Sequence, residues 1–188
     1  MSSFYTSRTK DKTDTSSDET YDTINLYLNS QQGAIALPGY PNINAGYTAV
    51  LANPIILDIS HRYVCALIKT SFDITNYTDK FYSYSIYCDL LEYQYEANNK
   101  TQLLYQVYAS RYIPAGDQNN QADLYVSVDN VVWKFINPTQ KIINRISFWV
   151  TDAATGLPLD TPAGFSYPTQ FSILIKKVNS HVVAVSAI

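Results

Sequence analysis

Histidines, paired carboxylates and activated nucleophiles build most enzyme sites, and this chain of 188 residues holds few of them in useful spacings. Its two histidines, His61 and His181, lie far apart in different loops, outside the His-x-His spacing that would put two imidazoles on one strand face. No Gly-x-Ser-x-Gly turn and no phosphate-binding glycine loop occurs. We therefore expect a protein that is not an enzyme, with no catalytic residues, no cofactor and no bound metal.

One segment brings several oxygen atoms close together. Asp152 and Asp160 flank a loop, and Thr151, Thr155 and Thr161 lie in it or directly beside it, so that these side chains could coordinate a hard cation such as calcium. A turn explains the same pattern, because an Asp side chain can accept hydrogen bonds from the backbone that follows it and Gly156 can adopt a positive φ. We favour the turn.

The chain contains 17 tyrosines, several of them in strand-like segments of its middle. Their rings could line a saccharide-binding surface, because a pyranose face stacks on an aromatic ring while the hydroxyl groups form hydrogen bonds. Strand packing and contact between subunits explain them as well, since tyrosine is common in strands and enriched at interfaces. We favour packing or subunit contact over glycan binding. The tyrosines concerned are Tyr82, Tyr84, Tyr93, Tyr95, Tyr105 and Tyr108.

The composition favours contact with other proteins. Only 15% of the residues are charged, well below the roughly 25% usual in globular chains, so much of the surface must be neutral. The net charge of −3 offers no clustered positive field for nucleic acid. The polar N-terminus lacks the pattern of a signal peptide, and no apolar run approaches the roughly 18 residues of a membrane span.

Cys65 and Cys88 are the only cysteines, and each lies inside a strand-like run. Two buried thiols are a better explanation than a disulfide, although the sequence leaves both open. Reduced thiols fit assembly inside a cell.

Hydrophobic periodicity predicts many short strands and little helix. Residues Tyr21–Leu28 alternate between polar and apolar faces, which is typical of a half-buried strand, whereas Tyr63–Phe72 is apolar on both faces and should lie centrally in a sheet. Pro54 should limit Ile55–Leu57 to the start or edge of a strand. The other expected strands are Tyr47–Leu51, Phe81–Cys88, Leu90–Tyr95, Gln102–Tyr112, Leu124–Val128, Val131–Ile136, Ile142–Thr151 and Phe171–Lys177.

Turn residues between these strands indicate a sandwich or barrel, because each strand needs a second sheet to cover its apolar face. We expect Ile146, Phe148, Val150 and Leu174 to contribute to the core of that sandwich.

The two ends differ from this domain, which we place at residues 21–178. Residues 1–20 are rich in Ser, Thr and charge, and we expect an extended arm that binds neighbouring chains through Phe4 and Tyr5. Residues 179–188 form a C-terminal tail or extra strand that should also reach a neighbour. Its candidate contact residues are Val183, Val185 and Ile188.

A longer motif carries a resemblance to a known group of proteins. Residues 143–160 read as a strand ending in Thr151-Asp152, a turn at Gly156 and an apolar-Asp step at Leu159-Asp160, and residues 171–175 follow as a closing strand. This pattern resembles the C-terminal part of penton and minor capsid proteins of virophages and Polinton-like viruses. Residues 50–58 and 63–68 look like the pair of strands that precedes the middle of the same domain.

The resemblance implies a single jelly-roll β-sandwich that forms the fivefold vertex of an icosahedral capsid. Its partners would be copies of itself, as a homopentamer, and the major capsid protein, and it would be found in the virion after assembly inside the host cell. Tyr82, Tyr84, Tyr105 and Tyr108 would then join the terminal residues at interfaces. The alternative is a virion spike head or a module that binds a receptor or glycan, and an enzyme is the third class.

Overall fold

The computed structural model describes residues 8–9, 23–40, 42–58, 60–73, 80–81, 83–96, 99–107, 112–113, 121–125, 131–159 and 168–178. All regular structure within these residues is β-strand, which confirms the expectation of an all-β chain. The strands are β1 (Arg8–Thr9), β2 (Thr23–Asn29), β3 (Ala34–Ala36), β4 (Gly46–Ile56), β5 (Arg62–Asp73), β6 (Lys80–Phe81), β7 (Tyr84–Cys88), β8 (Gln94–Glu96), β9 (Asn99–Thr101), β10 (Leu103–Val107), β11 (Tyr112–Ile113), β12 (Gln121–Tyr125), β13 (Lys134–Phe135), β14 (Ile142–Asp152) and β15 (Gln170–Val178).

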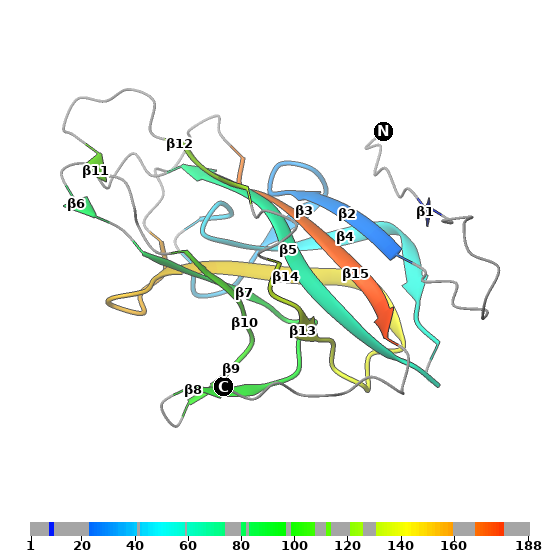
Figure 1. Ribbon diagram of the computed structural model, residues 1–188. Coiled ribbons are helices and arrows are strands. Elements are labelled where there is room, and N and C mark those ends of the chain that lie inside the picture. The colour runs from blue at the N-terminus through cyan, green and yellow to red at the C-terminus, as the bar shows by residue number, and fades with distance from the viewer. Residues whose placement is uncertain are drawn as a thin grey trace.

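Two antiparallel sheets face one another and form a β-sandwich (Figure 1). Sheet A has the order β1-β2-β15-β5-β12, with β13 also paired to β5, and sheet B has the order β10-β7-β14-β4-β3. The pairs β6–β11 and β8–β9 are separate two-stranded ribbons. Apart from β1, the strands come from the predicted domain of residues 21–178. β1 adds two residues of the predicted arm to the edge of sheet A beside β2.

Alternation along β14 decides which side chains enter the core. Ile146, Phe148 and Val150 are at most 1% exposed, as expected, and the residues between them face away from sheet A. Ile143 is also fully buried, although it precedes Ile146 by three positions. Between them the pairing with β4 is irregular, because Ile143 is opposite Ile55 and Arg145 is opposite Val50, so two steps along β14 face five along β4. This irregularity interrupts the alternation and leaves both isoleucines on the inner face.

The prediction for Leu174 is wrong. On β15 the inward residues are Phe171, Ile173 and Ile175, each at most 1% exposed, and Leu174 lies half-buried on the opposite face. Because side chains alternate along a strand, a phase error of one residue moves a side chain from the core to the outer face.

The central position of β5 is confirmed. β15 pairs with it on one side, and β12 and β13 pair with it on the other. Cys65 and Leu67 point into the core, whereas Val64 and Ala66 are buried outside the core cluster. Both faces of this strand are therefore covered, which explains why its sequence is apolar on both sides.

Pro54 lies inside a strand, whereas the sequence predicted a break before Ile55. β4 runs continuously from Gly46 to Ile56, but its register with β14 jumps from Val50 to Ile55. Pro54 thus lies in a stretch without regular pairing to β14. The position suits a residue that has no N–H to donate.

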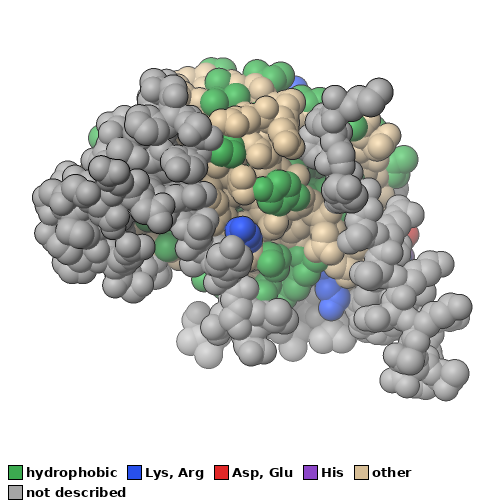
Figure 2. Space-filling view, turned by 90° about the horizontal axis from the view of Figure 1, so that it is seen from above, with side chains coloured by type: hydrophobic (Ala, Val, Ile, Leu, Met, Phe, Trp, Pro, Cys, Tyr) green, Lys and Arg blue, Asp and Glu red, His purple; other side chains and the backbone are tan. Residues whose placement is uncertain are grey.

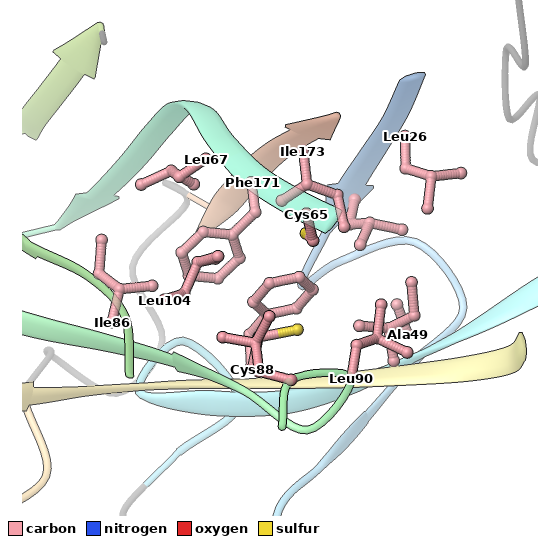
Figure 3. Packing of buried hydrophobic residues seen from close by; sticks show 14 of the residues in the cluster. Leu26, Ala49, Cys65, Leu67, Ile86, Cys88, Leu90, Leu104, Phe171 and Ile173 are labelled. Atoms are coloured by element: carbon pink, nitrogen blue, oxygen red, sulfur yellow. The ribbon is translucent and has the colours of Figure 1, made fainter. Parts of the chain in front are cut away.

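The core lies between the sheets and is built from aliphatic and aromatic side chains of both (Figure 3). Phe148 of sheet B stacks on Phe171 of sheet A with ring centroids 4.5 Å apart, and Tyr47 lies beside both rings. Cys65 and Cys88 are fully buried free thiols, so the preference for thiols over a disulfide is confirmed.

We predict that Phe148→Ala lowers the free energy of unfolding by about 3–5 kcal/mol, because it leaves a cavity where the two sheets meet. Chemical denaturation of the purified variant measures this loss. Tyr95→Ala removes a ring that is 75% exposed and should cost about 0.5 kcal/mol or less. Equal losses from the two substitutions would contradict the inward placement of Phe148.

The two thiols should react with a disulfide reagent only when the domain unfolds. Burial raises the pKa of Cys65 to about 12, and burial followed by the neighbouring Cys65 raises the pKa of Cys88. Because the thiolate is the reactive species, native protein should be inert at pH 8, and its labelling rate should follow the unfolded fraction as denaturant is added. Rapid labelling of the native chain, or fewer than two thiols in unreduced denatured protein, would contradict this prediction.

Candidate functional site

The outer face of sheet B carries a groove of about 690 Å³. Its floor comes from β7, β14 and β10, and its walls come from segments on either side of them. The described residues that line it are Tyr40, Ser85, Tyr87, Tyr93, Lys100, Thr101, Gln102, Gln106, Trp149, Thr151, Ala153 and Gly156.

An aromatic row crosses the floor of the groove. Trp149 of β14 stands opposite Tyr87 of β7, and their rings are stacked with centroids 5.4 Å apart and planes 7° from parallel. On its other side Trp149 is paired with Gly46 of β4. A Cβ atom at Gly46 would lie 2.8 Å from Cγ of Tyr40, so glycine at this position leaves the room that the Tyr40 ring occupies. The row therefore consists of Tyr40, Trp149 and Tyr87.

A polar row runs beside the aromatic row. Thr151 of β14 is paired with Ser85 of β7, which is paired with Gln106 of β10, and these residues lie two positions along from the aromatic ones. Two-residue spacing keeps both rows on the same outer face. Ser85 and Thr151 are only 6% and 7% exposed, so their hydroxyl groups sit deep in the floor.

One hydroxyl in the polar row lacks a hydrogen bond. Oγ1 of Thr151 is buried and has no hydrogen-bond partner. The hydroxyl groups of Tyr47 and Thr70 are also buried without a partner, but these two residues do not line the groove. By contrast, the Gln102 amide is held in one orientation, because its Nε2 donates to the carbonyl oxygens of Asp89 and Leu91 at 3.0 and 2.7 Å. The floor thus combines a fixed amide with an unsatisfied hydroxyl.

Two walls enclose the rows. On one side, Nζ of Lys100 lies 5.4 Å from the centre of the Tyr93 ring, next to the β8–β9 hairpin. On the other side stands the turn that contains Ala153 and Gly156. Lys100 is the only charged residue among the described residues that line the groove. Burial, and then the neighbouring Tyr87, raises the pKa of Tyr40 to about 12, so its phenol stays protonated at neutral pH.

The Asp152 segment is a turn, as favoured from the sequence. Oδ1 of Asp152 accepts hydrogen bonds from the backbone N–H groups of Ala154 and Thr155, both at 2.8 Å, and from the Thr155 hydroxyl at 3.2 Å. Gly156 has a φ of 70° and donates to the Asp152 carbonyl. The carboxylate oxygen is occupied by the turn itself, and Asp160 and Thr161 lie outside the described residues.

Asp58, Ser60 and His61 form a hydrogen-bonded cluster that was not predicted from the sequence. Nδ1 of His61 lies 2.9 Å from Oδ2 of Asp58 and 2.8 Å from Oγ of Ser60. Hydrogen bonds from Ser60, and then the contact with His61, lower the pKa of Asp58 to about 2. In a catalytic triad the acid and the nucleophile contact opposite ring nitrogens, whereas here both contact Nδ1. The adjoining cavity, about 20 Å³, has room for little more than one water molecule.

Two apolar patches lie on opposite flanks of the sandwich. The β3-side patch is a row spread along β4 rather than a compact cluster: Ile35 of β3 lies opposite Thr48, Val50 follows two positions later, and Ile56 lies opposite Ile142 of β14. These four side chains, Ile35, Val50, Ile56 and Ile142, are 44–78% exposed. The β13-side patch consists of Tyr95, Val132 and Trp133, which are 39–75% exposed. Its two segments are adjacent, since Glu92 donates to the carbonyl of Phe135 and Leu91 pairs with Ile136.

The outer side of sheet A differs from these patches. Figure 2 looks onto this side, where the described hydrophobic side chains are scattered among polar groups. Among the described residues of sheet A, Tyr27 on β2 is the one large hydrophobic side chain classed as exposed, at 43%.

The structure separates the predicted contact residues into three sets. The prediction that Tyr84 contacts another chain is wrong, because Tyr84 is only 4% exposed and belongs to the core. Tyr105 is half-buried and packs against the core, whereas Tyr93 and Tyr95 are 58% and 75% exposed. The remaining predicted contacts lie outside the described residues: Phe4, Tyr5, Tyr82, Tyr108, Val183, Val185 and Ile188.

The aromatic row was not predicted from the sequence either. Trp149 and Tyr87 each alternate with core residues, Phe148 and Val150 in one strand and Ile86 and Cys88 in the other. That alternation would have placed both rings on an outer face. Their pairing, and the presence of Tyr40 beside them, depends on the strand order.

No protein family was found to match the chain, and no curated protein is significantly similar to it. Among the described residues, no helix is long and apolar enough to cross a membrane, and no group of three or more His, Cys, Asp or Glu side chains is arranged to hold a metal ion.

Substitutions in the Asp152 turn should separate a structural turn from a cation site. Asp152→Ala should destabilise the domain by about 1 kcal/mol through lost hydrogen bonds, and Gly156→Ala by about 1–2 kcal/mol because of its positive φ. Asp152→Asn keeps the accepting oxygen and should stay close to the parent. Thermal unfolding with and without millimolar calcium measures all three. A calcium-dependent rise in melting temperature that disappears in Asp152→Asn would contradict the turn.

Proposed function

We propose that this chain is a jelly-roll capsid subunit that occupies the fivefold vertex of an icosahedral shell. It acts by contact with copies of itself and with the surrounding major capsid protein, and it carries out no chemistry. The resemblance of residues 143–160 and 171–175 to penton and minor capsid proteins points the same way.

The strand order supports the jelly-roll assignment. Eight strands, β2, β4, β5, β7, β10, β12, β14 and β15, divide equally between the two sheets as β2-β15-β5-β12 and β10-β7-β14-β4. In each sheet a strand from the end of the domain lies between two earlier strands: β15 lies between β2 and β5 in sheet A, and β14 lies between β7 and β4 in sheet B. Two interleaved Greek keys produce this arrangement.

The observation that carries the proposal is the position of the two apolar patches on opposite flanks. β3 and β10 are the two edges of sheet B, and a tight connection joins β2 to β3, so the β2 and β3 edges share one flank. β5 contacts β10, and β13 pairs with β5, which puts the β13-side patch on the other flank. A closed ring needs two different surfaces of this kind, because one flank of each copy meets the opposite flank of the next.

Ring closure through these patches predicts the mass of the particle. The parent chain should form a pentamer in light scattering, with five times the 21.2 kDa mass of the chain. The β3-side variant Ile56→Ser/Ile142→Ser and the β13-side variant Tyr95→Ser/Trp133→Ser should each be monomeric, with unchanged thermal unfolding. Leu157→Ser is the matched control, since Leu157 is 64% exposed but lies outside both patches.

Mixing the two variants tests the head-to-tail geometry. Each variant keeps one intact flank, so a mixture should form a dimer of one copy of each and no larger ring. A trimer of the parent would favour the alternative of a spike head. A monomeric parent, or variants with the parent's particle mass, would contradict assembly through these flanks.

A further inference from the structure

We propose that the groove on the outer face of sheet B binds a saccharide built from pyranose rings. This goes beyond the assembly role, and it rests on different residues from those of the two patches. The groove and the flanks can therefore be tested separately.

The unpaired hydroxyl of Thr151 is the observation that points to a ligand. A buried hydroxyl without a partner costs free energy, and native proteins leave few of them. Thr151 is 7% exposed and lines the floor of the groove, so its unpaired Oγ1 lies just beneath the surface of the floor, where rotation about χ1 can bring it to a ligand that fills the groove. A ligand rich in hydroxyl groups both donates and accepts there.

The two rows of the floor match the two kinds of surface that a pyranose presents. A pyranose ring has apolar faces of C–H groups and a rim of hydroxyl groups. The aromatic row of Tyr40, Trp149 and Tyr87 offers rings for the apolar face. The polar row, with Thr151 and Ser85, lies two positions away and offers hydroxyl groups for the rim.

The lining chemistry distinguishes a saccharide from a protein or lipid occupant. Among the described lining residues, Ala153 is the only one with an aliphatic side chain, and every ring belongs to Tyr or Trp and carries a polar atom. A groove for a protein helix or an acyl chain would need Leu, Ile, Val, Met or Phe. The exposed aliphatic side chains among the described residues lie outside the groove: Ile35, Val50, Ile56 and Ile142 in the β3-side patch, Val132 in the β13-side patch, and Leu157 in neither.

The size and charge of the groove narrow the ligand further. A volume of about 690 Å³ falls within the roughly 300–1,000 Å³ of small-ligand sites and accommodates more than one sugar ring. Lys100 is the only charged lining residue described, and no described carboxylate faces it within the groove. A saccharide that carries a carboxylate or sulfate group should therefore bind more tightly than its neutral counterpart, and added salt should reduce that difference.

The first experiment presents the full chain to an array of neutral, sialylated and sulfated oligosaccharides. The best binders are then titrated against the parent and against Trp133→Phe, in which Trp149 is the only remaining tryptophan. Because Trp133 belongs to the β13-side patch, equal affinities of these two proteins show that the change at the flank does not affect the groove. We expect saturable binding with a change in Trp149 fluorescence. Absence of binding by every saccharide on the array would overturn the proposal.

Thr151→Val then gives two effects of opposite sign. Valine has nearly the shape of threonine and removes the unpaired hydroxyl, so the variant should unfold at the parent's temperature or higher. Its affinity for the saccharide should fall about tenfold, as expected for one lost hydrogen bond with a desolvated partner. Thr48→Val is the matched control, because Thr48 is on sheet B, outside the groove, and its hydroxyl pairs with Ser147 at 3.0 Å. That variant should bind as the parent does.

Trp149→Ala should abolish detectable binding, and Gly46→Ala should weaken it by pushing the Tyr40 ring out of its place. If Thr151→Val and Trp149→Ala both bind as the parent does, the saccharide site lies elsewhere and the proposal is wrong. A fluorescence change in Trp149 that follows protein concentration rather than saccharide would identify the groove as a contact between subunits, which also overturns the proposal. Neither result depends on whether the chain forms a pentamer.

Discussion

The stacking of Phe148 on Phe171 joins the two sheets at the centre of the sandwich. Their ring centroids lie 4.5 Å apart, and Tyr47 completes the aromatic group from a third strand. With Phe148 turned inward, strand alternation sends Trp149 outward. Tyr87 and Thr151 follow the same rule beside Ile86 and Val150. The groove on the outer face of sheet B is thus the reverse side of the core.

Local irregularities adapt this alternation to the packing between the sheets. Register shifts occur at Ile143–Arg145 in β14, at Leu103–Tyr105 in β10 and at Ser172–Ile173 in the pairing of β15 with β5. A bulge moves one residue out of register and re-aims those that follow. The irregular pairing of β14 with β4 leaves Ile143 in the core and Ile142 exposed opposite Ile56. The same irregularity therefore contributes to the β3-side patch.

The patches and the groove divide the surface by chemistry. The β3-side patch presents aliphatic side chains, which favour contact with another protein, whereas the groove combines rings with hydroxyl and amide groups. A ring of subunits would repeat the groove once in each copy. Repetition raises the avidity for a surface that displays many copies of one saccharide, even where each single site binds weakly. The proposed assembly and the proposed binding would therefore reinforce each other.

Local patterns in the sequence were enough to predict an all-β sandwich, the central place of β5, the inward face of β14 and the Asp152 turn, because alternation and turn chemistry act over a few residues. They misplaced Leu174 by one residue, put Tyr84 on the surface and divided β4 at Pro54, since bulges and strand phase depend on what packs opposite. The row of Tyr40, Trp149 and Tyr87 joins three distant segments of the chain. Only the order of strands in sheet B brings these three residues together, because the spacing of residues in the sequence does not determine which strands pair.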